Sequence, residues 1–299
     1  MDLERELGSK LLNGIKINEP MSLHTSWKVG GPADYFLIPA SQGELVDIVR
    51  YASDHDLPLF VFGNGTNLLV RDGGIRGLVV HMGAPFHYIH WEKNGLVAGA
   101  GTPMPQLARA AAQKGLAGLE YAGGIPGSLG GALVMNAGAY GSYTGQLVED
   151  VTLVGPDGNI FRLGREKLDF GYRCSNLAGA GIITGARLKL EEGDPAELES
   201  RVEFFLAERR RRHPQLPSAG SVFRNLPDRP AGRLIEAAGG KGMRVGDACV
   251  SEQHANFIVN LGRATASDIL DLIGAVQRLV KERFGIELQP EVKVVGEEK

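Results

Sequence analysis

The sequence predicts a mixed α+β protein with more than one domain. Helices and β-hairpins are interleaved along the chain, whereas a doubly wound parallel sheet would need strands and helices in strict alternation. The segment His-Pro-Gln-Leu-Pro at residues 213–217 breaks a long predicted helix and marks a candidate domain boundary. With 299 residues, the chain is long enough for two or three hydrophobic cores.

Hydrophobic periodicity and turn residues locate the individual elements. Ser41 and Glu44 have capping-box spacing at the start of a predicted helix, and a short helix is expected at the first residues. The predicted helices are residues 41–55, 105–114, 194–212, 233–238 and 267–284. The predicted strands are residues 35–38, 59–62, 78–81, 181–190, 256–260 and 290–295, with hairpins at 87–98 and 148–163.

Composition argues against several classes of function. The formal net charge of −3 gives no reason to expect a nucleic-acid partner. The two cysteines, Cys174 and Cys249, make neither a disulfide framework nor a metal site, so no metal is expected. The N-terminus lacks a signal-peptide pattern, and no apolar run approaches the ~20 residues of a membrane span. We therefore expect a cytoplasmic protein without membrane contact or an obligatory protein partner.

A glycine-rich stretch at residues 122–141 is the first candidate ligand-binding segment. Seven of its 20 residues are glycine, but core-type residues such as Ile125 and Leu129 are interspersed, unlike in a flexible linker. Backbone N–H groups in such a turn can form an anion-binding concavity. A glycine-rich bend between buried elements explains this pattern equally well.

A second stretch, residues 60–74, favours the ligand interpretation. It contains Gly63 and Gly65, but Leu68 stands where the dinucleotide fingerprint G-x-G-x-x-G requires its third glycine. The P-loop motif is missing from the sequence, so a P-loop nucleotide hydrolase is disfavoured. Two separate turns suit one extended, doubly phosphorylated ligand, and a flavin dinucleotide is the natural candidate.

Three polar residues outside these stretches are candidates for chemistry: Arg173, Ser221 and Glu291. Taken singly, each has a structural explanation, as a surface cation, a turn cap and a solvated strand residue. Sequence spacing alone does not bring such distant residues together. The four arginines at residues 209–212 are suited to a diphosphate, but a solvated helix C-terminus, where cations are favourable, is the preferred interpretation.

Seven short motifs occur along the chain in a distinctive order. They are residues 27–33 (WKVGGPA), 63–69 (GNGTNLL), 124–131 (GIPGSLGG), 136–141 (NAGAYG), 172–173 (YR), 219–225 (AGSVFRN) and 254–260 (HANFIVN). Each motif alone is weak. In this combination the chain, from about residue 24 to residue 294, closely resembles the UDP-N-acetylenolpyruvoylglucosamine reductases, flavoenzymes of bacterial cell-wall precursor synthesis.

The resemblance implies a fold and a reaction. A two-lobed FAD-binding region of the vanillyl-alcohol-oxidase (PCMH) type would occupy residues 1–212, with lobes at about 1–83 and 84–212. A C-terminal α+β substrate domain would occupy residues 213–299, its last strand carrying Glu291. NADPH would reduce FAD, and the flavin would then reduce the enolpyruvyl ether of a UDP-sugar to a lactyl ether, giving UDP-N-acetylmuramate.

The resemblance also assigns residues. Arg173 would stabilise negative charge beside the substrate carboxylate, and Ser221 would donate a proton to carbon. Glu291 would act as a hydrogen-bond donor, so its pKa is expected to be raised. The implied substrate-binding residues are Tyr172, Arg173, Asn225 and Glu291. The implied FAD-binding residues are Gly63, Asn64, Gly65, Thr66, Asn67, Leu68, Gly123, Gly124, Ile125, Pro126, Gly127, Ser128, Gly131, Asn136, Ala137, Gly138 and Ile183.

One departure from the family concerns the segment between Arg173 and Ser221. Only 48 positions separate them and none is Tyr, whereas some family members have a longer insertion whose Tyr closes over the substrate. The chain resembles the shorter class, which leaves the cover of the nucleotide moiety open. Two alternatives are an oxidase of sugar alcohols or hydroxy acids on the same fold, and a flavin- or nucleotide-binding module without activity. The three catalytic matches argue against both.

Overall fold

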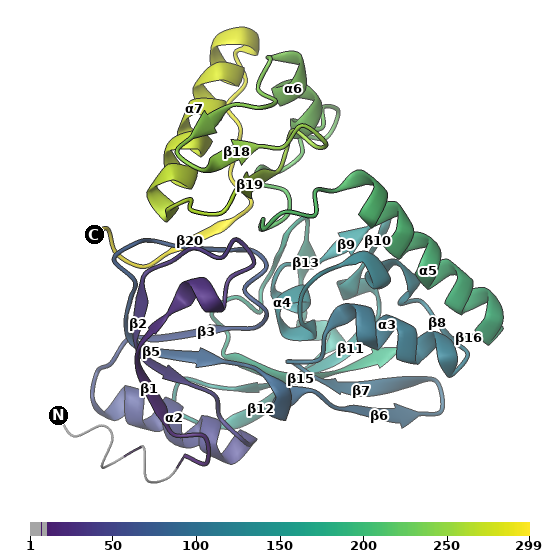
Figure 1. The fold of residues 1–299 in the computed structure, drawn as a ribbon. Helices are drawn as coiled ribbons and strands as arrows, with labels where there is room; N and C mark the ends of the chain where they lie inside the picture. Colours follow the sequence, from purple (N-terminus) through teal and green to yellow (C-terminus); the bar gives the residue numbers. More distant parts are fainter. Residues whose placement is uncertain (1–6, 8–10) are drawn as a thin grey trace. The chain divides into compact units, whose positions relative to one another are not determined.

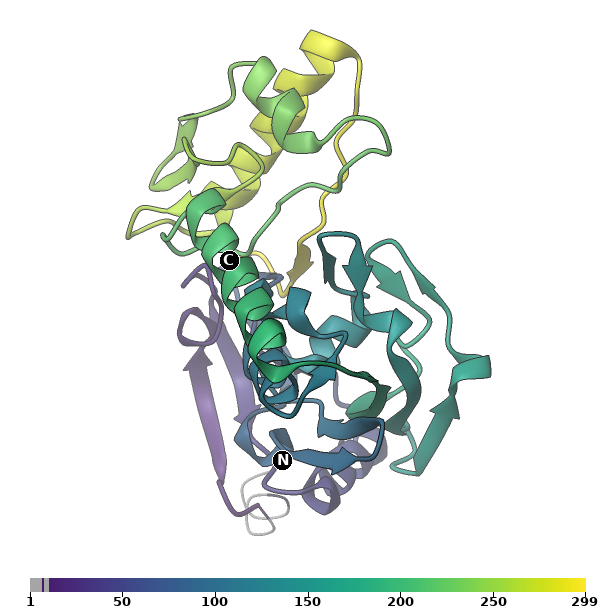
Figure 2. The same ribbon diagram turned by 90° about the vertical axis from the view of Figure 1, so that its right-hand side faces the viewer.

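The computed structural model describes Leu7 and residues 11–299, and the short helix expected at the first residues lies outside this part. The chain forms two compact units, and Figures 1 and 2 follow it through both. The first unit comprises Met1–Ile17, Tyr35–Asn64 and Gly77–Arg209, and the second comprises Asn18–Asp34, Gly65–Arg76 and Arg210–Lys299. The second unit thus combines the C-terminal part of the chain with two segments from its N-terminal part.

Two sheets form the framework of the first unit, although residues 18–20, 32–34 and 75–76, at the ends of three strands, belong to the second unit. The four-stranded sheet has the order β1 (Ile15–Pro20), β2 (Pro32–Leu37), β5 (Ile75–His81) and β3 (Leu59–Phe62), with β3 parallel to β5. The five-stranded sheet has the order β12 (Ile160–Gly164), β11 (Val148–Val154), β15 (Ile182–Lys189), β7 (Gly95–Gly99) and β6 (Ile89–Glu92), and its neighbours are antiparallel. The two predicted hairpins, β6–β7 and β11–β12, are confirmed and form its two edges.

Helices pack on these sheets around one continuous core. They are α2 (Gln42–Asp54), α3 (Met104–Gln113), α4 (Leu129–Val134) and α5 (Pro195–Arg212), whose last three residues belong to the second unit. Ser41 caps α2 as predicted, because its Oγ accepts the Glu44 N–H at 3.1 Å. The fully buried side chains of Ile48 on α2, Leu78 on β5 and Leu107 on α3 all belong to this core.

Short elements connect the larger ones. The short strands are β4 (Leu68–Val70), β8 (Leu116–Ala117), β9 (Gly138–Ala139), β10 (Ser142–Tyr143), β13 (Phe170–Gly171), β14 (Cys174–Ser175) and β16 (Glu191–Glu192). The 3₁₀ turns are η2 (Met21–Leu23), η3 (Ala84–Phe86), η4 (Glu120–Gly124), η5 (Thr144–Gln146) and η6 (Arg165–Lys167). The central glycine stretch, predicted only as a turn region, therefore contains η4 and α4.

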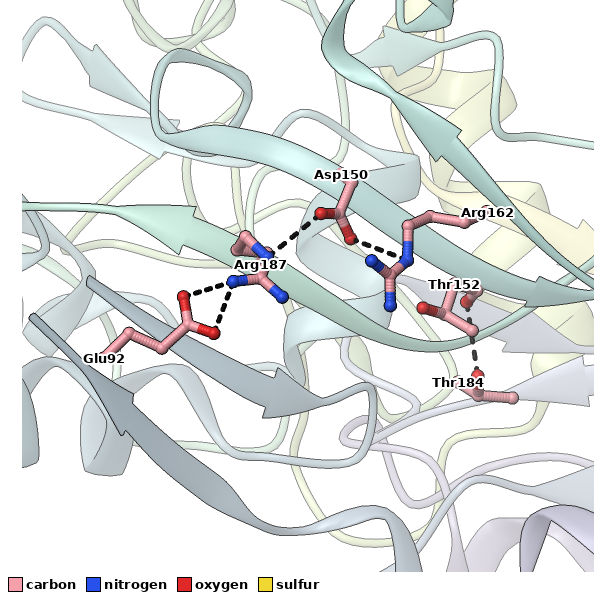
Figure 3. A network of polar contacts seen from close by, with 6 residues as sticks. All are labelled: Glu92, Asp150, Thr152, Arg162, Thr184 and Arg187. Carbon is pink, nitrogen blue, oxygen red and sulfur yellow. Dashed lines mark hydrogen bonds and ion pairs between the residues drawn. The ribbon is translucent and has the colours of Figure 1, made fainter. Parts of the chain in front are cut away.

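Charged side chains link the strands of the five-stranded sheet (Figure 3). Arg187 on β15 pairs with Glu92 on β6, and its Nε lies 3.1 Å from Asp150 Oδ2 on β11. Arg162 on β12 reaches the other oxygen of Asp150 at 3.5 Å. The hydrogen bond to Glu92 raises the pKa of the Arg187 guanidinium. Since β7 lies between β15 and β6, the Arg187–Glu92 pair ties the edge strand to the centre of the sheet.

The second unit has its own sheet and core. Its three-stranded sheet has the order β17 (Arg244–Val245), β18 (Ala248–Val250) and β19 (Ile258–Asn260), covered by α7 (Ala266–Phe284), which also contacts α6 (Ala231–Ala237). As predicted, α7 ends at Gly285, whose φ of 69° is left-handed. Trp27 is fully buried in this core and donates its indole N–H to the carbonyl of Ile258 at 2.7 Å. The segment Asn18–Asp34, which carries Trp27, is therefore an integral part of this unit.

The strand predicted at residues 290–295 is shorter in the structure. β20 (Lys293–Val295) begins two residues after Glu291 and pairs in parallel with β4. Pro290 has no N–H to offer a sheet, and the Glu291 N–H donates instead to the carbonyl of Val222 at 2.7 Å. The expectation that Glu291 lies within the last strand is therefore corrected: it lies in the extended segment before it.

Candidate flavin and substrate site

The central glycine stretch is held against a neighbouring turn of the first unit. Thr102 accepts the N–H of Leu129 at 2.9 Å, and Gly127 accepts the N–H of Met104, also at 2.9 Å. Ser128, at the N-cap position of α4, is buried. These bonds fix the course of the chain through the turn and direct the start of α4.

The two glycine stretches meet within the first unit. Gly63 follows β3 directly, and a Cβ built on it would stand 2.1 Å from the Oγ of Ser128. In the described part of the chain, the N–H groups of Gly63, Asn64, Gly127, Ser128 and Gly131 have no hydrogen-bond acceptor. Free N–H groups from two adjoining turns are donors of the kind that the diphosphate of a dinucleotide accepts. These residues of the predicted FAD set thus fit the cofactor.

Asn136 connects the glycine stretch to the segment that carries Arg173. The Asn136 side chain is buried, donates to the carbonyl of Gly171 at 2.9 Å and accepts the N–H of Gly145 at 2.9 Å. Gly171 ends β13, so the bond holds the tight turn at residues 172–173 between β13 and β14. The resemblance assigns Asn136 to FAD. In the structure its side-chain amide joins Gly171 and Gly145 within the first unit.

Arg173 has a strained backbone and a tethered side chain. Its φ of 57° lies in the left-handed region, where residues other than Gly, Asn and Asp are uncommon. Its guanidinium lies 5.5 Å from the Tyr172 ring centroid and donates to the carbonyl of Gly138 at 3.3 Å. Backbone strain of this kind is concentrated at functional sites. Arg173, Tyr172 and Gly138, three predicted site residues, are thereby brought together.

The structure also places Ile183 and the four arginines at the end of α5. Ile183 is a buried core residue on β15, the central strand of the five-stranded sheet. Among the four arginines at the end of α5, residues 210–212 are exposed, as expected for a solvated helix end. Arg209 differs, because burial lowers the pKa of its guanidinium. Arg209 is half-buried, so the solvated interpretation describes it less well than residues 210–212.

In the second unit, Ser221 and Glu291 lie on neighbouring segments. Glu291 donates its N–H to the carbonyl of Val222, the residue after Ser221, at 2.7 Å. The residues that flank this bond, Phe223 and Pro290, form an isolated antiparallel bridge. The structure thus brings together two of the three predicted catalytic residues, and Arg173 belongs to the other unit.

Asn256 anchors the Ser221 segment, and sequence reasoning did not single it out. It is almost fully buried, accepts the N–H of Phe223 at 2.9 Å and returns a hydrogen bond to the Phe223 carbonyl at 2.8 Å. Its own carbonyl accepts the N–H of Val222 at 2.8 Å. The only signal in the sequence was its place in the motif at residues 254–260. Asn225, assigned to the substrate, accepts the N–H of Ala231 at the start of α6 at 3.0 Å.

The described residues form neither a metal site nor a membrane span. Among the residues that the structure describes, no group of three or more His, Cys, Asp or Glu side chains is placed to hold a metal ion. None of the helices in the described residues is both long and apolar enough to cross a membrane.

Comparison with known proteins first defines a class. Residues 33–164 match a FAD binding domain, so the glycine turns belong to a flavoprotein. Residues 212–295 match the C-terminal domain of UDP-N-acetylenolpyruvoylglucosamine reductase. The chain is 46% identical to that reductase from Desulforamulus reducens over 99% of this chain and 98% of the relative. For the Rubrobacter xylanophilus reductase the identity is 47%, over 96% of this chain and 97% of the relative. The chain belongs to the UDP-N-acetylenolpyruvoylglucosamine reductase family.

A solved structure agrees with this membership. The crystal structure of the reductase (MurB) from Thermus caldophilus matches with a TM-score of 0.80 and 38% identity, covering 94% of this chain and 97% of that one. The predicted α+β fold with a FAD-binding domain and a C-terminal domain is confirmed. So are the FAD cofactor and the flavin-dependent reductase activity in peptidoglycan precursor synthesis.

Proposed function

We propose that this protein uses NADPH and bound FAD to reduce UDP-N-acetyl-enolpyruvoylglucosamine to UDP-N-acetylmuramate in the cytoplasm. The proposal assigns FAD to the turns at residues 63–68 and 123–131, and the UDP-sugar to the substrate-binding domain at residues 213–299. The observation that carries the catalytic assignment is the Glu291–Val222 hydrogen bond, which puts Glu291 and Ser221 on adjoining segments. When bound, FAD supplies the redox chemistry, passing a hydride from NADPH to the substrate.

The reaction adds a hydride and a proton across the enolpyruvyl double bond. The hydride goes to the terminal carbon, so negative charge develops on the adjacent carbon and delocalises into the substrate carboxylate. Arg173 is suited to stabilise this charge, because its guanidinium is planar and permanently charged. Its tether to the Gly138 carbonyl fixes the direction of the side chain before substrate binds.

Ser221 and Glu291 complete the proposed chemistry. Ser221 donates the proton to the carbon that carries the developing charge, which finishes the reduction to a lactyl ether. A hydroxyl is a weak acid, so this role depends on where Ser221 is placed. The hydrogen bonds of Asn256 to Val222 and Phe223, the two residues after Ser221, hold the segment in place. Glu291, as a hydrogen-bond donor, positions the substrate beside Ser221. This division of roles separates the protein from an oxidase, which needs no proton donor to a substrate carbon.

The test follows the two half-reactions of Ser221→Ala by rapid-mixing absorbance of the flavin band. Bleaching by NADPH should proceed at close to the wild-type rate, because that step needs no substrate proton. Recolouring by the enolpyruvyl substrate should slow by roughly 10²–10⁴-fold, the usual contribution of general acid catalysis. Ser221→Cys keeps a transferable proton and should recover part of the second step. Equal slowing of both half-reactions in Ser221→Ala would rule out the proton-donor role.

A further inference from the structure

Asn67 connects the first glycine turn to the segment that carries Glu291. Its side-chain amide donates to the carbonyl of Glu291 at 3.2 Å, and its backbone carbonyl accepts the N–H of Lys293 at 2.9 Å. A carbonyl oxygen can only be met by the NH₂ side of the amide, so the orientation of the Asn67 side chain is fixed by this contact. One residue of the turn therefore holds the C-terminal segment at two points.

The opposite side of Glu291 is held by the segment that carries Ser221. The Glu291 N–H donates to the Val222 carbonyl at 2.7 Å, and the Arg224 N–H donates to the Gln289 carbonyl at 2.9 Å. The backbone of Glu291 is thus fixed through its N–H toward Ser221 and through its carbonyl toward Asn67. All of these contacts lie within the second unit.

Regular secondary structure gives Glu291 little other support. β20 and β4 are three residues each, and their ladder begins only at the Lys293–Leu68 pair. The preceding residue, Pro290, has no N–H with which to extend the ladder. A side-chain hydrogen bond from Asn67 stands where a backbone ladder bond would otherwise be.

We propose that Asn67 is a positioning residue for the reductase reaction, holding Glu291 in register with Ser221. This inference rests on the roles that the proposed function gives to Glu291 and Ser221. The resemblance assigned Asn67 to FAD, but the structure commits its amide to the backbone of Glu291. The second half-reaction, in which substrate is reduced, therefore depends on Asn67 more than the reduction of the flavin by NADPH does.

The test uses the holoenzyme with excess FAD and compares Asn67→Ala with a matched control. The control is Gln277→Ala, because Gln277 on α7 also donates its side-chain amide to a backbone carbonyl of the same segment, that of Leu288, at 2.8 Å. Asn67→Ala should slow flavin reoxidation by saturating enolpyruvyl substrate by at least 10-fold, with bleaching by NADPH near wild type. Gln277→Ala should lower the melting temperature about as much as Asn67→Ala does, without slowing either half-reaction. If both variants slowed flavin reoxidation, the effect of Asn67→Ala would be explained by a general loss of stability in this segment, and the proposal would be overturned.

A double-mutant cycle with Glu291→Gln tests whether the effect passes through the Glu291 carboxyl. Asn67→Ala should add almost nothing in the Glu291→Gln background, whereas multiplied effects would overturn the proposal. If Glu291→Gln itself leaves reoxidation unchanged, the role of Glu291 in the proposed function is wrong. If Glu291→Gln is slow and Asn67→Ala is not, the proposed function stands and the positioning role fails.

A second variant separates positioning from flavin binding and guards against loss of the fold. Asn67→Asp keeps the shape of the side chain but puts an acceptor oxygen against the Glu291 carbonyl. Its reoxidation defect, relative to wild type at each pH, should shrink as the pH falls and the new carboxyl becomes a donor. FAD titration by fluorescence gives each variant's cofactor affinity independently of activity. A defect in Asn67→Ala and Asn67→Asp that tracks FAD affinity alone, without this pH dependence, would contradict the positioning role.

Discussion

The backbone of Gly63 lies against the side chain of Ser128, so closely that a Cβ on Gly63 would stand 2.1 Å from the Ser128 Oγ and 3.2 Å from its Cβ. Side-chain contacts of 2.1 Å do not occur, so a larger residue at position 63 requires the Ser128 hydroxyl to rotate away and the Ser128 Cβ to move slightly. Glycine at position 63 therefore permits the present close approach of the backbone to Ser128. The N–H groups that fit a diphosphate come from both turns, so their spacing depends on this contact.

Gly63→Ala is expected to weaken FAD binding. The added methyl group displaces the buried Ser128 side chain, and this disturbs the arrangement of the N–H groups that the two turns offer to one ligand. We expect the dissociation constant for FAD to rise by at least 10-fold and the purified protein to lose flavin. The absorbance ratio of flavin to protein and a FAD titration measure both effects.

Gly43→Ala is the control for this substitution. Gly43 lies in the first turn of α2, and its new Cβ would meet the Ser41 Oγ at an ordinary 3.6 Å. The variant should bind FAD like the wild type. If Gly63→Ala retained full flavin content and affinity, the close contact with Ser128 would have no part in forming the FAD site.

Asp72 caps α7 from a distant part of the sequence. Its carboxylate accepts the N–H of Ala266 at 2.9 Å, the N–H of Ser267 at 2.9 Å and the Ser267 hydroxyl at 2.7 Å. Partial burial alone would raise the pKa of Asp72, but these hydrogen bonds outweigh it and lower the pKa. Because the folded-state pKa lies below the unfolded value, this stabilisation is complete above about pH 4 and disappears as the pH falls through the folded-state value.

Asp72→Asn should therefore lower the free energy of unfolding by about 1–2 kcal/mol at pH 7, the usual cost of losing a helix cap. The difference from wild type should shrink between pH 4 and pH 2, which urea unfolding at several pH values will measure. Asp271→Asn, an exposed change on the same helix, should have little effect at any pH. A constant difference between Asp72→Asn and wild type down to pH 2 would show that the capping carboxylate is not the source.

Local sequence patterns predicted most of the elements, because those patterns act over one or two turns of chain. The limits of α7 follow from the cap at Thr265 and the left-handed Gly285, and both are near-neighbour effects. The pairing of distant segments follows different rules. Asn67 and Glu291 are 224 positions apart, and no periodicity in either segment encodes their contact. The same limit hid Asn256, whose partners lie 33 positions away.

The site was predicted from family motifs more than from physical pattern. Motif matching identified Arg173, but its left-handed φ was not foreseen, since arginine has no preference for that region. The last strand was predicted over residues 290–295, which placed Glu291 within it. In the structure the N–H of Glu291 donates to the carbonyl of Val222 in the Ser221 segment. Tertiary contacts and the neighbouring Pro290 determine this pairing.

The backbone of Arg173 gives a prediction in which two variants differ in stability but lose activity equally. A left-handed φ costs a non-glycine residue about 1–2 kcal/mol, and the greater freedom of glycine in the unfolded chain offsets only part of this. Arg173→Gly should therefore be more stable than Arg173→Gln by about 0.5–1 kcal/mol in urea unfolding. Both variants lose the guanidinium, so flavin reoxidation by the enolpyruvyl substrate should slow by about 10²–10³-fold in each. Bleaching by NADPH should stay near the wild-type rate.

If Arg173→Gly were the less stable of the two variants, the backbone of Arg173, with its φ of 57°, would carry no strain. Near-normal reoxidation in Arg173→Gln would remove Arg173 from the reaction.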